Sequence, residues 1–329
     1  MKIKNLLSLS LAAATFAFAS CDKTMDEEPL DEIQNFEESS LKSTESWVLE
    51  SQTNFPEMSV PSWHWMRSKE RKVDTYVSTH FNGSTLPQGW IRHNYENASS
   101  GSGFNYNKIQ WTGQRNSLVT GQPFPFAFAL WEDDANWASK VEGGKLVLRV
   151  YWDNNQNKFL GGFVRTEQKY ADGLFQIKSY INKSEKGWVH GFWTFDSQHE
   201  IDIYEIKGTG KSGNDERTHM PTNFHRSLWS QATGLVDQIP NMGKTITGLP
   251  SAENGSTYAC LKTSDYVEFF NNGNLVRRET KGQNQYLDEV FSHPQRIILN
   301  SEYQNWIADP SNKTAVAEHK IEYFARYKW

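Results

Sequence analysis

Cysteine is scarce in this chain of 329 residues, with only Cys21 and Cys260 present. Two cysteines form at most one disulfide, so the fold cannot depend on a disulfide framework. A membrane-spanning helix needs about 20 consecutive apolar residues, and the apolar stretch from Leu6 to Phe18 is shorter than that. The sequence therefore predicts a folded domain that relies on its own hydrophobic core.

The chain also lacks an excess of basic residues. Residues 1–40 contain three of its 34 basic and eight of its 39 acidic residues, which leaves 31 of each sign in residues 41–329. Because a protein that binds nucleic acid usually carries a clear excess of Lys and Arg, nucleic acid is not an expected partner. Aromatic residues are plentiful, with 13 Trp, 13 Tyr and 19 Phe. Their flat faces suit both core packing and stacking on sugar rings.

The N-terminus has the pattern of an export signal. Two lysines precede the apolar stretch, and the small residues Ala19 and Ser20 stand directly before Cys21. A charged start, a short apolar core and small residues at a cleavage point are typical of a signal peptide. The residues before Cys21 resemble a bacterial lipobox, which implies a lipoprotein signal peptide over residues 1–20 and lipidation of the Cys21 thiol. An ordinary signal peptide with a chance cysteine is the alternative.

Residues 21–45 are predicted to form an acidic tether, because the run from Asp22 to Glu28 is rich in carboxylates and further acids continue to Glu38. A segment of this composition stays solvated. It also resembles the acidic export signal of lipoproteins on the surface of polysaccharide-degrading Gram-negative bacteria. This resemblance implies an outer-membrane lipoprotein, held by a lipid anchor and exposed on the cell surface, with a periplasmic location as the alternative.

Residues 46–329 have the pattern of one all-β domain. Short runs rich in β-branched and aromatic residues are separated by Gly, Asn, Asp and Pro, and no run of ten or more residues has a convincing helical period. A hairpin is predicted over 266–278, where two strand-like segments flank an Asn- and Gly-rich turn. Many short strands favour a sandwich or jelly roll. The other strand candidates are 145–151, 159–165, 173–181, 189–195, 296–300 and 321–327.

The segment 200–205 contains three carboxylates, Glu200, Asp202 and Glu205, separated by strong strand formers. In a regular strand Glu200 and Asp202 share one face, whereas Glu205 points to the other. One extra residue in a β-bulge would return Glu205 to the shared face. Clustered carboxylates raise one another's pKa, and glycoside hydrolysis needs one ionised and one protonated carboxyl group. An edge strand with solvated acids is the alternative.

This segment resembles the Glu-x-Asp-x-x-Glu signature of glycoside hydrolase family 16 in its β-bulge form, and the resemblance extends over roughly residues 145–329. It implies a jelly-roll β-sandwich of two curved antiparallel sheets with a substrate cleft, and an enzyme that cleaves β-linked glucans or galactans with retention. It further implies that Glu200 is the nucleophile and Glu205 the general acid/base. Asp202, between them, would control through hydrogen bonds which carboxyl group holds the proton.

The residues around the signature, at 194–199 and 298–306, resemble agarases and porphyranases more than laminarinases or lichenases. This implies an endo-acting retaining hydrolase of β-1,4-galactosidic linkages in red-algal galactans, with porphyran slightly favoured over agarose. The sugar contacts that the resemblance implies are Trp90, Arg92, Trp193, His225, Glu302 and Trp306.

Porphyran carries sulfate, which the planar guanidinium of arginine binds well. Arg92, Arg165 and Arg226 are candidate sulfate ligands, with ordinary surface charge as the alternative for each.

Two other functions stay open. A non-catalytic surface glycan-binding protein of the same fold would need the aromatic residues but not three intact acids, so the acids favour an enzyme. A β-1,3-glucanase is the alternative within the enzymes. No metal site is predicted, because His190, His199 and His225 lack the spacing of a ligand set. We expect no required cofactor, leave a structural calcium open, and expect a monomer whose partner is a polysaccharide.

Overall fold

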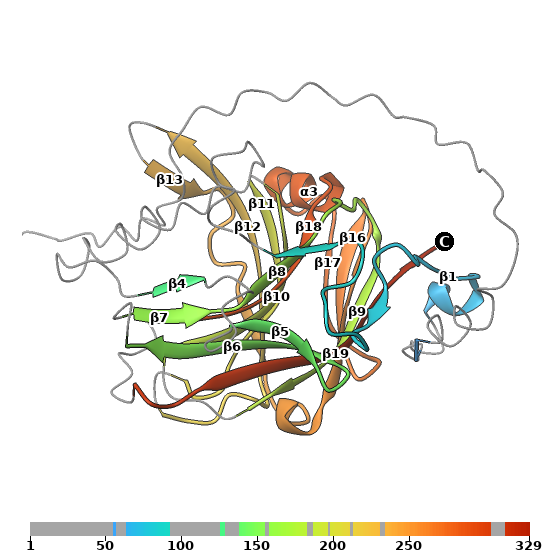
Figure 1. Cartoon of the computed structure of the whole chain (residues 1–329). Coiled ribbons are helices and arrows are strands. Elements are labelled where there is room, and N and C mark those ends of the chain that lie inside the picture. The colour runs from blue at the N-terminus through green and yellow to red at the C-terminus, as the bar shows by residue number, and fades with distance from the viewer. Residues whose placement is uncertain are drawn as a thin grey trace, which may run out of the picture.

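The computed structural model describes residues 55–56, 64–92, 126–128, 138–154, 158–182, 187–196, 198–210, 213–230, 234–303 and 313–329. These residues form two stacked, curved β-sheets with one short α-helix at one end (Figure 1). The predicted all-β jelly-roll sandwich is confirmed. Within these ranges no helix has the length and apolar character needed to cross a membrane. The predicted signal peptide, lipidation site and tether lie outside the described residues.

The first sheet, sheet A, has the spatial order β17-β16-β15-β9-β19-β6-β7-β4, with β1 and β2 paired to β19 and β5 paired to β6. Its strands are β1 (Lys72–Val73), β2 (Thr79–His80), β4 (Phe126–Phe128), β5 (Ser139–Glu142), β6 (Lys145–Asp153), β7 (Lys158–Gly161), β9 (Gly173–Ile181), β15 (Ser256–Lys262), β16 (Tyr266–Asn271), β17 (Asn274–Thr280) and β19 (Ala317–Lys328).

The second sheet, sheet B, has the order β13-β12-β11-β10-β18-β8-β3, with β14 beside β12. Its strands are β3 (Trp90–Arg92), β8 (Phe163–Thr166), β10 (Trp188–Phe195), β11 (His199–Lys207), β12 (Met220–Ser230), β13 (Gly234–Asp237), β14 (Lys244–Ile246) and β18 (Arg296–Tyr303). The described helices are the 3₁₀-helices η1 (Trp65–Ser68) and η3 (Ala252–Asn254) and the α-helix α3 (Gln285–Ser292).

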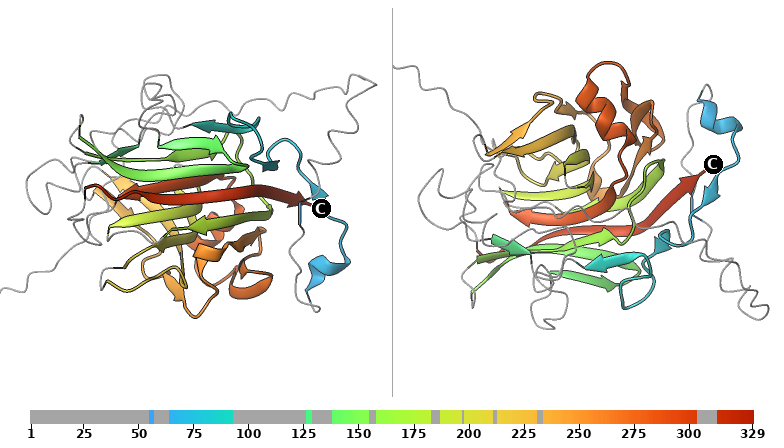
Figure 2. Two further views of the ribbon diagram at one scale, coloured as in Figure 1. Left: turned by 60° about the horizontal axis from the view of Figure 1, so that its bottom comes forward. Right: turned by 90° about the horizontal axis from the view of Figure 1, so that it is seen from above.

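The main core lies between the two sheets, whose layers are visible in Figure 2. Phe175 and Ile177 of β9 enter it from sheet A, and Ile201 and Ile203 of β11 enter it from sheet B. Each such fully buried side chain contributes about 1.5–3 kcal/mol. Because side chains alternate along a strand, the residues between these apolar positions of β11 point to the outer face of sheet B.

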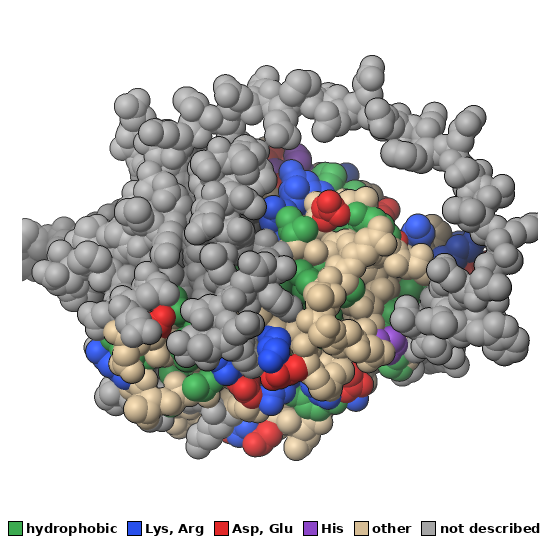
Figure 3. All heavy atoms as spheres, in the orientation of Figure 1, with side chains coloured by type: hydrophobic (Ala, Val, Ile, Leu, Met, Phe, Trp, Pro, Cys, Tyr) green, Lys and Arg blue, Asp and Glu red, His purple; other side chains and the backbone are tan. Residues whose placement is uncertain are grey.

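The outer face of sheet A is covered by a second apolar cluster. Phe55 and Met66, from the segment before β1, pack there with Leu261 of β15 and Tyr323 of β19. The two sheets are therefore used differently, since one outer face is buried by the N-terminal segment and the other carries the acids of β11. On the face seen in Figure 3, acidic and basic side chains of the described residues are interspersed, in agreement with the balanced charge of residues 41–329.

The predicted hairpin is confirmed, because β16 and β17 pair through a two-residue turn. Asn272 and Gly273 have φ values of 47° and 83°, the left-handed backbone that such a turn requires. The candidate strand 159–165 is divided, since the chain passes from sheet A to sheet B at Gly162. A Cβ at Gly162 would collide with the carbonyl oxygen of Ala138, so glycine permits this crossing.

Two further features depart from a purely antiparallel β fold. β4 pairs with β7 in parallel. Helix α3 spans 8 residues, whereas the sequence pattern argued only against helical runs of ten residues or more. It forms because the Asn284 side chain accepts a hydrogen bond from the Tyr286 N–H at 2.8 Å, and because Leu287, Val290 and Phe291 pack into the core.

Candidate active site

The three carboxylates predicted to be catalytic lie on β11, which carries a β-bulge. The pairing of β10 with β11 shifts by one residue between Asp202 and Tyr204, which leaves Ile203 without a partner on β10. Ile203 and Tyr204 both pack into the core, so Glu205 returns to the face that carries Glu200 and Asp202. The bulge predicted from the spacing of the acids is therefore confirmed.

Trp193 of β10 lies beside Asp202 on the same face of sheet B. Its indole Nε1 donates a hydrogen bond to the side-chain oxygen of Asn300 on β18, at 3.1 Å. Gly191 leaves room for this contact, since a Cβ at that position would overlap the amide of Asn300. Trp193 also packs against Phe195 and is 9% exposed. The tryptophan predicted to contact sugar is thus held directly next to the acids.

Glu302, another predicted sugar contact, lies on β18 two positions beyond Asn300, so both point to the acid-bearing face. Burial, followed by the negative charges of Asp202 and Glu302, raises the pKa of Glu205 to about 7, with nearby cations offsetting part of this rise. A carboxyl group with such a pKa keeps a proton close to neutral pH. Glu205 therefore has the property required of a proton donor.

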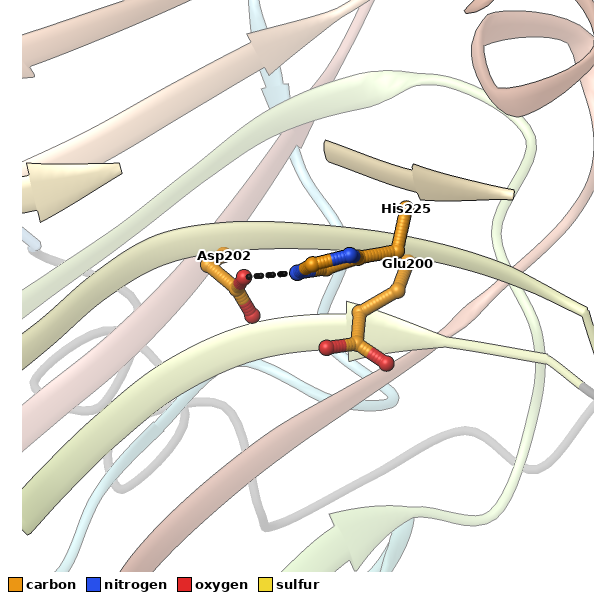
Figure 4. Close-up of side chains that lie close together, drawn as sticks. All are labelled: Glu200, Asp202 and His225. Atoms are coloured by element: carbon orange, nitrogen blue, oxygen red, sulfur yellow. Dashed lines mark ion pairs between the residues drawn. The ribbon is translucent and has the colours of Figure 1, made fainter. Parts of the chain in front are cut away.

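His225 lies on β12 directly opposite Glu200. Its Nε2 is 3.4 Å from Oδ2 of Asp202 (Figure 4), and its Nδ1 is 2.7 Å from Oδ2 of Asp237. Burial alone lowers the pKa of His225, but the hydrogen bonds to Asp202 and Asp237 outweigh it and raise the pKa to about 12. His225 is therefore held between the carboxylates of Asp202 and Asp237, and its Nε2 also lies 2.8 Å from Nδ2 of Asn223.

The charge of His225 acts on Glu200. Burial and the charge of Asp202 raise the pKa of Glu200 well above its usual range, whereas His225 lowers it. Donor atoms of Glu200, Asp202 and His225 lie within 4.8 Å of one another, a spacing that would also suit a metal ion. Because two of its three members are the carboxylates predicted to be catalytic, we interpret the cluster as a group of sites that hold protons.

Comparison with known proteins finds similarity in structure. No protein-family model matches the sequence, and no curated protein matches it. SCLam, a non-specific endo-β-1,3(4)-glucanase from family GH16, superposes with a TM-score of 0.57 at 17% identity, over 84% of this chain and 95% of that chain. The chain has the fold of this glucanase.

Two further solved structures agree. The catalytic domain of a laminarinase from Thermotoga petrophila gives a TM-score of 0.56 at 18% identity, covering 79% of this chain and 98% of that chain. A β-glucanase from Bacillus licheniformis gives 0.53 at 18% identity, covering 78% and 100%. The similarity to these structures extends over the two stacked sheets of this chain.

Within the glucanase fold, Trp90 does not lie where the sequence analysis predicted. Its side chain is 5% exposed, and its Nε1 donates to the carbonyl oxygen of Val77 at 2.9 Å. Its ring packs edge-on against Phe81 and Phe324 in the core between the sheets. A ring held there has no free face for a sugar, so the prediction of a sugar contact at Trp90 is wrong.

The arginines predicted as sulfate ligands have different positions. Arg165 on β8 lies on the acid-bearing face and is 5% exposed. Burial and the positive charge of Arg296 lower the pKa of Arg165 to about 10, so two guanidinium groups lie near each other there. Arg226 points to the opposite face of β12, where its Nε donates to Glu289 of α3 at 2.6 Å, so the prediction for Arg226 is wrong. The Arg92 side chain and Trp306 lie outside the described part of the chain.

Sequence reasoning missed three residues of this site. Asp237 contacts His225, Asn300 contacts Trp193, and the charge of Arg296 acts on Arg165. Asn300 had a local signal, because it stands two positions before Glu302 in a strand-like segment. Asp237 had none, because its contact with His225 depends on the pairing of β13 with β12.

Proposed function

We propose that the domain is a retaining glycoside hydrolase of family 16. One observation carries this proposal, namely the bulge in β11 that gathers Glu200, Asp202 and Glu205 on one face beside Trp193. An edge strand with solvated acids does not account for Asp202, which is 3% exposed, or for the raised pKa values of Glu200 and Glu205. A binding protein would have no use for three carboxylates that repel one another in a half-buried cluster.

In the proposed mechanism Glu200 attacks the anomeric carbon while Glu205 donates its proton to the glycosidic oxygen of the leaving group. The ionised Glu205 then takes a proton from water, and the water oxygen attacks the anomeric carbon and breaks the bond to Glu200. Two inversions at the same carbon give net retention. Asp202 lies between the two glutamates, and its charge helps Glu205 to keep the proton. None of these steps requires a cofactor.

We propose a red-algal galactan as the substrate, cleaved within the chain at β-1,4-galactosidic linkages, with porphyran ahead of agarose. The residues that flank the acids support a galactan. The neighbouring guanidinium groups of Arg165 and Arg296 support an anionic substituent, because arginine binds sulfate through two directed hydrogen bonds. A β-1,3-glucan is the second candidate, favoured by the glucanase and laminarinase that share the fold.

We also propose that Cys21 carries a lipid and that residues 21–45 tether the domain to the outer membrane at the cell surface. The sequence pattern supports this location. Mass spectrometry of the N-terminal peptide tests the modification, and protease treatment of intact cells tests surface exposure. A Cys21→Ala variant that stays in the membrane fraction would contradict the lipid anchor.

The decisive experiment is chromatography of products from porphyran, agarose and laminarin, with Glu200→Gln beside the wild type. Glu318→Gln is the matched control, because Glu318 lies on β19 in the other sheet and pairs with Lys320. We expect sulfated oligosaccharides from porphyran, none with Glu200→Gln, and wild-type amounts with Glu318→Gln.

The other outcomes each assign a different function. Neutral products from agarose would indicate an agarase, and products from laminarin alone would indicate the glucanase. Binding without any product would indicate a glycan-binding protein. Full activity in Glu200→Gln would refute the nucleophile assignment. An NMR spectrum of the first product formed tests retention, since an inverted anomeric centre is incompatible with a covalent intermediate on Glu200.

A further inference from the structure

A chain of buried hydrogen bonds crosses the core behind the acids. Tyr204, the second inward-pointing residue of the bulge in β11, is fully buried, and its hydroxyl group lies 2.7 Å from Nε2 of His319 on β19. The same hydroxyl group contacts Oγ of Ser179 on β9 at 2.9 Å. Nδ1 of His319 lies 3.2 Å from the backbone carbonyl oxygen of Asn300 on β18. The chain therefore connects the strand of the acids with the strand whose side chain holds Trp193.

The contact with Asn300 determines which nitrogen of the His319 ring carries hydrogen. A carbonyl oxygen can only accept a hydrogen bond, so Nδ1 carries the proton. The ring is fully buried, and no carboxylate of the described residues pairs with it, so a second proton would place an unpaired charge in the core. The low pKa of His319, about 4, agrees with a neutral ring. Nε2 therefore presents a lone pair, which accepts the hydroxyl hydrogen of Tyr204.

This hydrogen bond acts on the bulge itself. Regular alternation beyond Asp202 would turn Tyr204 to the outer face of sheet B and Glu205 into the core. An outward Tyr204 would lose both partners of its hydroxyl group and would leave Nε2 of His319 buried without a donor. A phenylalanine at position 204 would fill the same space without burying a polar atom, so the hydroxyl group is not needed for packing. It is needed where one register of the strand has to be preferred over another.

We propose that Tyr204 and His319 are positioning residues whose buried hydrogen bond fixes the bulge of β11 and thereby places the carboxyl group of Glu205 beside the other two acids. The inference rests on the proposed glycosidase function. Both residues point into the core, away from the face that carries the acids. They act through the backbone of β11, and no bond to either of them forms or breaks in the reaction.

The variant Tyr204→Phe tests this inference, because it removes the hydroxyl group and keeps the aromatic ring in the core. Tyr258→Phe is the matched control. The ring of Tyr258 is also buried and packs against that of Tyr204, with 4.6 Å between the centroids, but its hydroxyl group bonds to Ser256 instead. The control therefore removes a buried hydroxyl group beside the chain and leaves the chain intact. His319→Leu removes the other end of the same hydrogen bond.

The first measurement is kcat and KM on the polysaccharide that the wild type cleaves. We expect Tyr204→Phe to lower kcat about 10- to 100-fold, because a small displacement of a catalytic group is costly, and to change KM by less than about 2-fold. Tyr258→Phe should keep the kcat of the wild type. Since Tyr204 and His319 share one bond, adding Tyr204→Phe to His319→Leu should change kcat by less than about 2-fold.

The second measurement is a ¹³C NMR titration of the Glu205 carboxyl group, which is independent of any activity. The charge of Asp202 contributes to the raised pKa of Glu205, which is about 7. In Tyr204→Phe the two carboxyl groups are no longer held together, so we expect the pKa of Glu205 to fall by at least about half a pH unit. A hydroxyl group that only stabilised the core would leave this titration unchanged, as we expect for Tyr258→Phe.

Several outcomes would overturn the inference. A wild-type kcat in Tyr204→Phe would show that the hydroxyl group does not position the acids, and so would an unchanged titration of Glu205. An equal loss of kcat in Tyr258→Phe would point to a general loosening of the core. Losses that add in the double variant would show that Tyr204 and His319 do not act through their shared bond. A wild type that cleaves none of the polysaccharides would refute the proposed function, while the NMR titration would still decide whether Tyr204 places Glu205.

Discussion

A methyl group at position 191 tests how the site holds its tryptophan. Gly191 lies under the amide of Asn300, and a Cβ built there overlaps that amide and lies 3.1 Å from Cδ1 of Trp193. The same amide accepts the indole N–H of Trp193 at 3.1 Å. In Gly191→Ala the Asn300 side chain must therefore move away, and the indole loses its acceptor.

Two terms set the expected loss of stability. Forcing an extra methyl group into a packed site costs about 1–3 kcal/mol. A buried N–H left without an acceptor costs about 1–3 kcal/mol as well, and Trp193 is exposed by only 9%. We therefore expect Gly191→Ala to lower the free energy of unfolding by about 2–6 kcal/mol. Because Trp193 is released from its position, KM for the polysaccharide should rise as well.

Urea denaturation of the wild type, Gly191→Ala, Asn300→Ala and the double variant measures this loss. Asn300→Ala removes both the acceptor and the obstacle, so adding Gly191→Ala to it should cost little. We expect the double variant to match Asn300→Ala within about 0.5 kcal/mol. If the two single losses simply add, the close approach of Gly191 and Asn300 is not the reason for a glycine at this position.

Two further predictions concern pH. Glu302→Gln removes a charge that raises the pKa of Glu205. The alkaline limb of the pH profile of kcat should therefore move down by roughly half to one pH unit. An unchanged limb would show that Glu302 does not act on the proton donor. His319 is fully buried between the sheets, and burial lowers its pKa from 6.5 to about 4. Because the unfolded chain then binds the proton first as the pH falls, stability should decrease between about pH 6.5 and pH 4, by up to about 3 kcal/mol. Urea denaturation at several pH values measures this decrease, and an equal slope in a His319→Gln variant would contradict it.

The acids of β11 could be predicted from sequence because the rule that places them is local. Alternation along a strand decides which face each residue takes, and three acids at positions 200, 202 and 205 require one extra residue to share a face. The hairpin turn at Asn272 and Gly273 was predictable for the same reason, since only a few residue types adopt its left-handed backbone. Such features need no knowledge of distant parts of the chain.

The residues that the sequence did not place are those whose role depends on contacts with other elements of the fold. Trp90 lies on a strand of only three residues, too short for a pattern that distinguishes its core side from its outer side. Arg226 directly follows His225, so alternation places it on the opposite face of β12, where it pairs with Glu289 of helix α3. Asp237 has meaning only through the pairing of β13 with β12. The positions of Trp90 and Asp237 follow from tertiary structure, whereas alternation along β12 is enough to place Arg226 and His225 on opposite faces.

The bulge at Ile203 has a consequence for how this protein tolerates change. Another apolar residue at position 203 keeps the number of residues between Asp202 and Glu205, and so keeps both carboxyl groups on the outer face of sheet B. Deleting position 203 would remove the extra residue together with the bulge, so that Asp202 and Glu205 would lie two positions apart in a regular strand and would still share the outer face. Deleting Ile201 instead would leave Glu200 and Asp202 adjacent and on opposite faces, so a length change at that position should abolish the acid cluster although every acid is still present. The cluster therefore depends on how many residues separate the acids, whereas the side chain at position 203 only has to fill its space in the core.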